Sequence, residues 1–468
     1  MAEYKTPGVY IEEIPKLPPS IASVETAIPA FIGYTEKAQW KVAGDLTNKP
    51  WRIESMLEYD LYFGGAKPDA GIEITVDTTQ GKVDIQGAIN AELSSKYLMY
   101  YSLQMFFING GGPCYITSVG GYSDGDVILD ADLQGGLAEV EKIDEVTLLL
   151  FPDAINMASA GNYYALYALA IAQCVKLKDR FTVLDVYPDP ANAGNWRLDV
   201  DFLRNTLSGT TDDLKYAAVY FPRIYTRTDF TYNEGDVKII SNGAGDIGAT
   251  LTELKSNNNA YYNMARGAIN DIQMLLPASS AVVGVYATVD NNRGVWKAPA
   301  NVNIEYAVAP EMLITQEDQE SLNVDTTAGK SINVIRSFPG RGPAIIWGAR
   351  TLAGNDNEWR YIPVRRFFNM VEESTKNAAQ QFVFEPNDRN TWIRVRSMIE
   401  NYLTQQWKAG ALMGTTTREA FYVRIGLGET MTEQDIWEGR MIVEIGLAVV
   451  RPAEFIILRF MHKMLTEA

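Results

Sequence analysis

The sequence predicts a mixed α/β protein whose core contains βαβ units. The apolar runs 145–151 (EVTLLLF) and 181–187 (FTVLDVY) flank a helical stretch at residues 158–178, and the connections between them are short. This order is typical of a βαβ unit in a parallel sheet. Apolar residues make up 47% of the 468-residue chain, which is enough to fill large cores. We therefore expect a folded α/β body rather than a disordered chain.

The two ends of the chain are short, extended and apolar. Residues 9–14 (VYIEEI) are followed by Pro15, and residues 454–460 (EFIILRF) follow Arg451 and Pro452. A terminal strand with no neighbour is an adhesive edge, so each arm needs a partner. Strand exchange between subunits uses extended arms of this kind. The ends therefore favour an assembly protein.

Composition narrows the classes of function. The formal net charge of −17 would repel a phosphate backbone, so nucleic acid is not expected as a partner. No apolar run approaches the roughly 20 residues of a membrane span, and the N-terminus lacks the basic and apolar regions of a secretory signal. Two cysteines, Cys114 and Cys174, exclude a disulfide framework and favour synthesis in a reducing compartment. One histidine, His462, leaves few options for a zinc site or a Ser-His-Asp triad.

We expect five regions along the chain. Residues 36–95 combine aromatic residues and glycines with alternating Ile and Val, which indicates a small insertion that contains β-structure. Residues 226–260 are polar and rich in Gly and Asn, which indicates a long loop or a second insertion. The regions are an N-terminal arm (1–20), an α/β region (21–35 and 96–360), the inserted domain (36–95), a C-terminal core (361–450) and a C-terminal arm (451–468).

Local patterns place the individual elements. Predicted strands occupy residues 24–34, 114–119, 145–151, 181–187, 217–221, 331–338, 345–348, 421–427 and 441–450. Predicted helices occupy residues 97–107, 158–178, 259–275, 277–289, 364–384, 391–409 and 431–438. Asn390 is suited to cap the helix 391–409, and Gly410 is suited to end it.

Two glycine motifs resemble nucleotide-binding loops. Residues 324–331 (VDTTAGKS) match a phosphate loop except for its first glycine, but a polar stretch precedes them and a β-like stretch follows. A phosphate loop needs a strand before it and a helix after it. Residues 243–248 (GAGDIG) match GxGxxG in letters, but no second strand with an acidic end follows about 20 residues later. Polar surface loops explain both motifs better.

Other candidates for chemistry are weak. Adjacent carboxylates such as Glu12-Glu13, Asp212-Asp213 and Glu372-Glu373 point to different faces of an element and do not form an acid/base pair on their own. His462 lies on the C-terminal arm, where a catalytic base would be mobile. Lipase-type serine, zinc-protease and calcium-loop motifs do not occur in the sequence. We expect a protein that is not an enzyme, with no catalytic residues, no metal site and no cofactor.

The helix at residues 391–409 is amphipathic. Its apolar face carries Trp392, Val395, Ile399, Tyr402, Leu403 and Trp407. Its polar face carries Arg394, Ser397, Asn401, Thr404, Gln405 and Lys408. Two cations on this face contrast with the acidic charge of the whole chain. The face is either a solvated surface or a charged docking face for another protein.

Several blocks of sequence resemble contractile tail sheath proteins. These proteins occur in contractile-tailed phages, R-type bacteriocins and extracellular contractile injection systems. The blocks are TPGVYIEEI (6–14), FFINGGGPCYITSV (106–119), RGVWKAPANV (293–302), SINVIRSFPGRGPAIIWGARTL (331–352), YIPVRRFF (361–368) and MTEQDIWEGRMIVEIGLAVVRPAEFIILRF (431–460). They cover both ends and the centre of the chain in the family's order. Residues 36–95 and 226–260 carry no such block, so we expect them to be decorations on the outside of an assembly.

The resemblance implies a helical sheath of many copies around an inner tube, linked by strands that neighbouring subunits exchange. The exchanged strands would contain Val9, Tyr10, Ile11, Glu12, Ile14, Glu454, Phe455, Ile456, Ile457, Leu458 and Phe460. The receiving strands would contain Phe421, Val423, Ile425, Ile442, Val443, Ile445, Leu447 and Val449. The tube-facing helix would present Arg394, Ser397, Asn401, Gln405 and Lys408.

The resemblance also implies a mechanism, partners and a place of action. The extended sheath would be metastable, and its contraction would drive the tube outward through a target envelope without a nucleotide. Partners would be other copies of the chain, the inner tube protein, and baseplate and terminal cap proteins, with no nucleic acid and no membrane insertion. Assembly would occur in the bacterial cytoplasm, into a phage tail or a tail-like particle that can be released from the cell. The alternatives are a specialised sheath paralogue near the baseplate and a nucleotide-dependent α/β enzyme that uses Gly243 to Gly248.

Overall fold

The computed structural model describes residues 21–123 and 125–457. The chain divides into two compact units. The larger unit consists of residues 25–370 and 451–468, and the smaller unit consists of residues 1–24 and 371–450. The boundary falls inside helix α11, Ile362–Ala379.

The larger unit is built on a nine-stranded sheet with the order β12-β15-β14-β8-β7-β6-β1-β5-β2. The six strands from β14 to β5 are parallel, and antiparallel pairs close both edges. The strands are β1 (Pro29–Thr35), β2 (Trp51–Ile53), β5 (Cys114–Gly121), β6 (Leu148–Leu150), β7 (Phe181–Asp185), β8 (Ala217–Phe221), β12 (Val302–Asn303), β14 (Asn333–Phe338) and β15 (Gly342–Ile346). Helix α4, Ala160–Leu177, connects the parallel strands β6 and β7, which confirms the predicted βαβ unit.

Both faces of this sheet are buried. Neighbouring side chains of β1 point to opposite faces, so Ile32 packs in one apolar cluster and Phe31 in another. The Ile32 cluster contains side chains of α3 (Asp130–Val140), α4 and α5 (Trp196–Thr206). The Phe31 cluster contains side chains of α1 (Met56–Phe63), α2 (Met99–Ile108) and α9 (Ser279–Arg293). Helices on both faces explain why the parallel strands read as continuous apolar runs.

The carboxylate of Asp153 joins β1 to the start of α2. It accepts hydrogen bonds from the backbone N–H groups of Tyr34 (2.7 Å), Leu98 (2.6 Å) and Met99 (3.0 Å). A Cβ atom at Gly33 would overlap this carboxylate, so only glycine fits there. Burial raises the pKa of Asp153 to about 6, although the three N–H groups act in the opposite direction.

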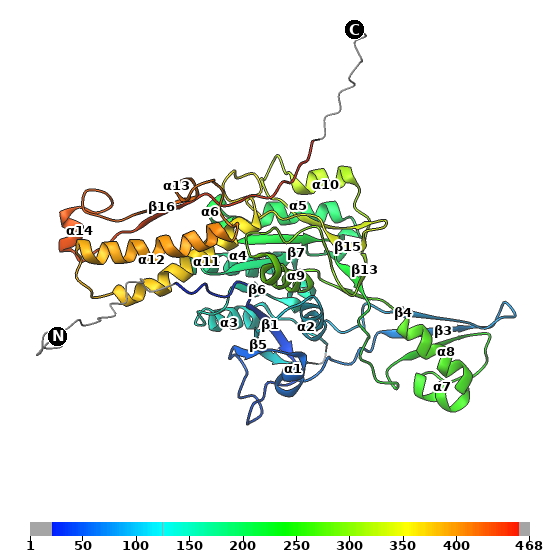
Figure 1. Cartoon of the computed structure of the whole chain (residues 1–468). Coiled ribbons are helices and arrows are strands. Elements are labelled where there is room, and N and C mark those ends of the chain that lie inside the picture. The colour runs from blue at the N-terminus through cyan, green and yellow to red at the C-terminus, as the bar shows by residue number, and fades with distance from the viewer. Residues whose placement is uncertain (1–20, 124, 458–468) are drawn as a thin grey trace, which may run out of the picture. The chain divides into compact units, whose positions relative to one another are not determined.

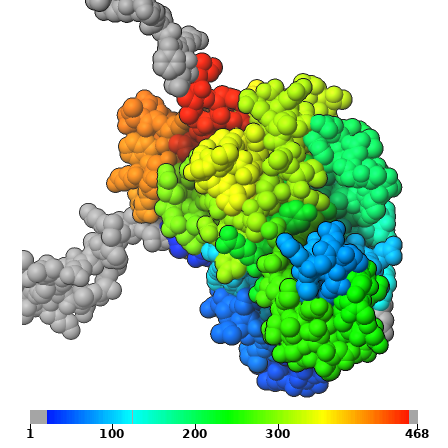
Figure 2. Space-filling model, turned by 90° about the vertical axis from the view of Figure 1, so that its right-hand side faces the viewer, coloured from blue at the N-terminus to red at the C-terminus, as the bar shows by residue number. Residues whose placement is uncertain are grey.

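Parts of the two stretches predicted as insertions come together in one lobe. Strands β3 (Ile72–Asp77) and β4 (Asp84–Ile89) pair as a hairpin, and β10 (Lys238–Asn242) adds parallel to β3. Helices α7 (Leu251–Asn257) and α8 (Asn259–Asn270) complete the lobe. Figure 2 shows the hairpin in blue lying against the green helices.

The predicted insertion does not begin at residue 36, because β2 pairs with β5 in the main sheet. The side chains of Ile53, Tyr59 and Phe63 are buried in the same cluster as Phe31. The first part of the range 36–95 therefore belongs to the main core, and the hairpin β3–β4 belongs to the lobe.

The predicted helix 259–275 ends earlier than expected. Helix α8 ends at Asn270, and residues Met274–Leu276 form strand β11, which pairs with β9 (Ile224–Thr226). Strand β13 (Ala307–Pro310) pairs with the opposite edge of β9. This pairing buries Met274 and Leu276, and it outweighs the local helical pattern.

Short helices complete the larger unit. They are η1 (Pro152–Asn156), η2 (Pro190–Asn192), α6 (Thr211–Leu214) and α10 (Gln316–Asn323). Within the described ranges, no helix is both long and apolar enough to cross a bilayer.

The smaller unit contains the end of α11, a long helix and a two-stranded sheet (Figure 1). The long helix is α12 (Arg389–Lys408), and the sheet consists of β16 (Phe421–Arg424) and β17 (Glu444–Leu447). The short helices of this unit are η3 (Gln380–Phe382), α13 (Thr417–Ala420) and α14 (Glu433–Trp437). Asp388, not Asn390, caps α12, because its side chain accepts a hydrogen bond from Thr391 N at 2.9 Å. Gly410 follows the helix with a φ of 90°.

Candidate functional site

The two-stranded sheet of the smaller unit is the first candidate site. Strands β16 and β17 are antiparallel, with Phe421 opposite Leu447 and Val423 opposite Ile445. Phe421 and Val423 are buried on the face that packs on α12, whereas Tyr422 and Arg424 point outward. A sheet of two strands has little stability by itself. Each strand also keeps one edge without a strand beside it in the described part of the chain.

The residues predicted for the receiving strands differ in burial. Ile425 and Val449 are buried, and Ile445 and Leu447 are half-buried. Ile442 and Val443 precede β17, and Ile442 is 40% exposed. Leu412 forms a bridge to Val449 and extends the pairing beyond β17.

The arms predicted to exchange strands lie largely outside the described residues. This applies to Val9, Tyr10, Ile11, Glu12, Ile14, Leu458, Phe460 and also His462. Residues 451–457 are described and form no strand. Phe455, Ile456 and Ile457 are 70%, 79% and 78% exposed, so an extended apolar segment leaves the larger unit here. Glu454 differs from them, because its carboxylate is bound by Arg350 of the same unit.

The predicted polar face of α12 lies at the surface of the smaller unit. Arg394, Asn401, Gln405 and Lys408 are exposed, and Ser397 is half-buried. Arg394 forms an ion pair with Glu385 at 2.9 Å, and both side chains are solvent-accessible. On the opposite face Val395, Ile399, Tyr402 and Leu403 are buried, as the amphipathic pattern predicts.

The glycine motif at residues 243–248 forms the turn between β10 and α7 in the lobe. Carboxylate oxygens bind the backbone at the end of the motif. Gly248 N donates to Asp246 at 3.3 Å, the next residue Ala249 N donates to Glu253 at 2.6 Å, and Thr250 caps α7. A carboxylate at the start of α7 occupies the place where a phosphate would bind.

In the motif at residues 324–331, a carboxylate of the chain also binds backbone N–H groups. The carboxylate of Asp325 accepts hydrogen bonds from Thr327 N at 3.1 Å and from Ala328 N at 3.0 Å. Strand β14 follows the motif, so no helix N-terminus faces it. The backbone N–H groups that would hold a phosphate are therefore engaged by the chain's own acid.

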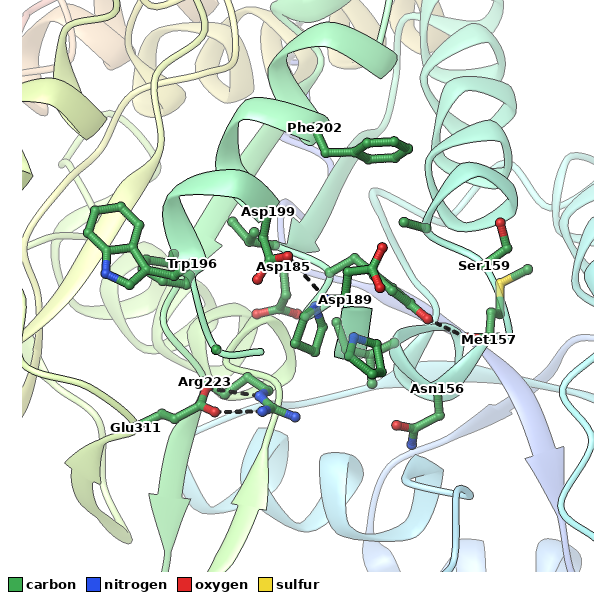
Figure 3. Close-up of a pocket in the computed structure, with 18 of the residues that line it drawn as sticks. Asn156, Met157, Ser159, Asp185, Asp189, Trp196, Asp199, Phe202, Arg223 and Glu311 are labelled. Atoms are coloured by element: carbon green, nitrogen blue, oxygen red, sulfur yellow. Dashed lines mark hydrogen bonds and ion pairs between the residues drawn. The ribbon is translucent and has the colours of Figure 1, made fainter. Parts of the chain in front are cut away.

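A cavity of about 760 Å³ opens at the carboxyl ends of β7 and β8, where α/β proteins commonly bind ligands. Figure 3 shows Trp196, Asp199 and Phe202 projecting from α5, with Arg223 facing Glu311. The residues that line this cavity do not include Gly243 to Gly248.

The charged groups in the cavity are held by the chain itself. Arg223 donates two hydrogen bonds to Glu311, at 3.0 Å and 2.5 Å. Asp185 accepts from Ala278 N (2.9 Å) and Ser279 N (3.1 Å) at the start of α9. Burial raises the pKa of Asp185 to about 6, against the effect of these donors. Asp199 accepts from Asn192 Nδ2 at 2.6 Å. The arrangement secures loops around the sheet.

No group of three or more potential metal ligands occurs among the residues that the structure describes. Cys114 and Cys174 are both buried, and burial raises the pKa of each thiol. Thiolate chemistry at neutral pH is therefore unfavourable at these two positions.

Comparison with known proteins identifies relatives along the whole chain. A family model for the phage tail sheath C-terminal domain matches residues 354–462. The sheath of the anti-feeding prophage in its contracted state is 31% identical, with a TM-score of 0.65, over 98% of this chain and 100% of that chain. The contracted PVC sheath, from an extracellular contractile injection system, is 30% identical, with a TM-score of 0.65, over 99% of both chains.

A curated relative matches over a shorter region. The tail sheath protein of Vibrio phage KVP40 is 28% identical over 135 residues, which are 29% of this chain and 20% of the phage protein. The match to this phage protein thus spans about a fifth of its length.

Proposed function

The chain belongs to the family of contractile sheath proteins, and we propose that it is the structural subunit of a sheath that polymerises helically around an inner tube and contracts to drive that tube through a target envelope. The similarity to sheaths of extracellular contractile injection systems extends over nearly the whole chain. It supports a subunit of a tail-like injection particle that is assembled in the bacterial cytoplasm and acts outside the cell that made it.

The observation that carries the proposal is that one chain contains both a small sheet that can accept a further strand and an exposed apolar segment that can supply one. Strands β16 and β17 form a two-stranded sheet, and within residues 21–123 and 125–457 no further strand lies beside either outer edge. Residues 455–457 are apolar, extended and exposed. If the segment of one subunit added as a strand to the sheet of its neighbour, the sheet would gain a third strand and the apolar side chains would be covered. Residues 9–14 at the N-terminus are the second strand that we propose for exchange.

This joint explains how a sheath can contract without falling apart. Main-chain hydrogen bonds link neighbouring subunits through the arms and do not depend on the contacts between the compact bodies. The bodies can then rotate and repack while the links persist. The stored energy would lie in the metastable packing of the extended sheath, so no nucleotide is needed.

A structural role agrees with the chemistry of the chain. Carboxylates bind backbone N–H groups at both motifs that resemble nucleotide loops. Asp325 binds two N–H groups inside the motif 324–331, and Asp246 and Glu253 bind the N–H groups of Gly248 and Ala249 at the end of the motif 243–248. We therefore favour the sheath over a nucleotide-dependent enzyme. We further propose that the polar face of α12, with Arg394 and Lys408, contacts the tube, and that baseplate and terminal cap proteins contact the ends of the sheath.

Sedimentation of the purified chain with and without ATP separates the two functions. A sheath subunit forms large particles that sediment in a concentration-dependent manner, and ATP changes neither their amount nor their size. Binding of ATP at micromolar affinity by a species that stays monomeric would contradict the proposal and favour the enzyme.

A further inference from the structure

Glu454, the last polar residue before the exposed apolar segment, is held by a clamp of three side chains. Arg350 Nε lies 2.9 Å from Oε1 and Arg350 Nη2 lies 2.6 Å from Oε2. Asn323 Nδ2 donates to Oε1 at 2.8 Å, and the hydroxyl of Tyr361 donates to Oε2 at 3.2 Å. The Arg350 side chain is only 4% exposed. A bidentate pair in a buried setting is among the stronger polar contacts in proteins.

Other residues of the larger unit orient the side chains that form the clamp. The second terminal nitrogen of Arg350 donates to Asn323 O (3.2 Å) and Gly354 O (3.3 Å), which sets the orientation of the guanidinium. The hydroxyl of Ser331 donates to the same Asn323 oxygen at 2.5 Å. A Cβ atom at residue 354 would overlap the Ser331 hydroxyl, so glycine is required there. The motif at residues 324–331 thus has a structural use, because it positions Asn323 and Ser331.

Charge also favours the clamped state. Burial alone would raise the pKa of the Glu454 carboxyl, but hydrogen bonds from Arg350 and Asn323 and the charge of Arg350 outweigh burial and lower the pKa. Glu454 therefore stays ionised throughout the neutral range. The clamp weakens only as the pH falls through this lowered pKa, which lies below the ordinary value of a glutamate carboxyl.

The chain changes character on either side of this point. Three residues before Glu454, Arg451 donates to Asn357 O at 2.8 Å, so both Arg451 and Glu454 hold residues 451–454 to the larger unit. Phe455, Ile456 and Ile457 then extend into solvent. The position and direction in which the apolar segment leaves are therefore set at Glu454.

We propose that Glu454 is the anchor of the C-terminal arm: it fixes residues 451–454 to their own subunit, and the segment that pairs with a neighbouring subunit begins at Phe455. This inference rests on the proposed sheath function. An anchored arm searches a smaller volume than a free one, which raises its effective concentration at the neighbouring sheet and lowers the ordering cost of assembly. The anchor also transfers load from the exchanged strand to the main sheet through Arg350, which follows β15.

Two measurements on the full chain test the anchor. In the first, Ala453→Cys carries a nitroxide label, and the buried Cys114 and Cys174 stay unlabelled. In the unassembled protein, we expect the label to move several-fold faster after Glu454→Ala, with Glu454→Gln in between because its amide oxygen still accepts a bond. Glu320→Gln, on exposed α10, is the matched control and leaves the label unchanged. Equal label mobility in Glu454→Ala and the parent would overturn the anchor.

The second measurement is the lowest protein concentration at which particles form. We expect Glu454→Ala to raise this concentration by about tenfold. We expect Glu454→Gln to leave the thermal unfolding midpoint unchanged. Equal concentrations for Glu454→Ala and the parent would also overturn the anchor. If the parent forms no particles while the label mobility still rises, the sheath proposal fails, and with it the pairing from Phe455 onward, but the attachment of residues 451–454 to their own subunit stands.

Discussion

Arg366 and Asp290 form a bidentate ion pair in the interior of the larger unit. Arg366 Nη1 lies 3.1 Å from Asp290 Oδ1, and Arg366 Nη2 lies 2.5 Å from Asp290 Oδ2. The side chain of Arg366 is 3% exposed and that of Asp290 is 6% exposed. Arg366 also donates to Thr26 O at 3.0 Å, and the Thr26 hydroxyl donates to Asp290 at 2.6 Å. The pair therefore ties the first turns of α11 to the end of α9 and to the segment that leads into β1.

Removing one partner of this pair should be costly. We expect Asp290→Ala to lower the free energy of unfolding by about 3–5 kcal/mol, because it leaves a buried guanidinium without its counter-charge. Urea titration of the unassembled protein measures the change. Glu385→Ala is the control, because it breaks the solvent-accessible pair with Arg394 and should cost less than about 1 kcal/mol. Equal losses in the two variants would contradict this account.

The buried carboxylate of Asp153 predicts a dependence of stability on pH. Its pKa is about 6 in the folded chain against an ordinary value of 3.8. Its stabilising contribution is fully present below the ordinary pKa and is lost as the pH rises through about 6. Between pH 7.5 and pH 5 the parent should gain about 1.4 kcal/mol more than Asp153→Asn. Urea titrations at both pH values measure this difference, and the same gain in both proteins would refute the assignment.

The parallel core could be predicted because its signals are local. Apolar runs of strand length alternate with a helix over residues 145–187, and handedness and connection length restrict how such a unit folds. These patterns repeat within a few residues, so one sequence is enough to read them.

Contacts between distant segments could not be predicted in this way. Strand β10 adds to β3, and Lys238 pairs with Glu73 from a segment far earlier in the chain. Asp153 is bound by residues 119 and 55 positions away. The clamp on Glu454 joins Arg350 across 104 positions. In each case the partner is chosen by the tertiary fold, and neither residue type nor spacing indicates it.

The polar face of α12 supports a prediction about the tube. Changing Arg394 and Lys408 to Glu together should weaken co-assembly with the inner tube protein of the same particle, because both cations are exposed on this face. Folding should change by less than about 1 kcal/mol, since the ion pair that Arg394 forms with Glu385 is solvent-accessible. Co-sedimentation of sheath and tube measures assembly. Changing the exposed Lys41 and Lys82 to Glu gives the same change in net charge away from this face. Undiminished co-assembly of the α12 variant would remove the assignment.

The central claim is that copies of this chain form a sheath through exchanged strands. Negative-stain electron microscopy of the full chain, beside a variant that lacks residues 1–20, tests it most directly. We predict hollow helical tubes from the full chain and their loss after the deletion. Tubes from both proteins would contradict the exchange of the N-terminal strand, and separate particles of uniform size from the full chain would contradict the sheath itself.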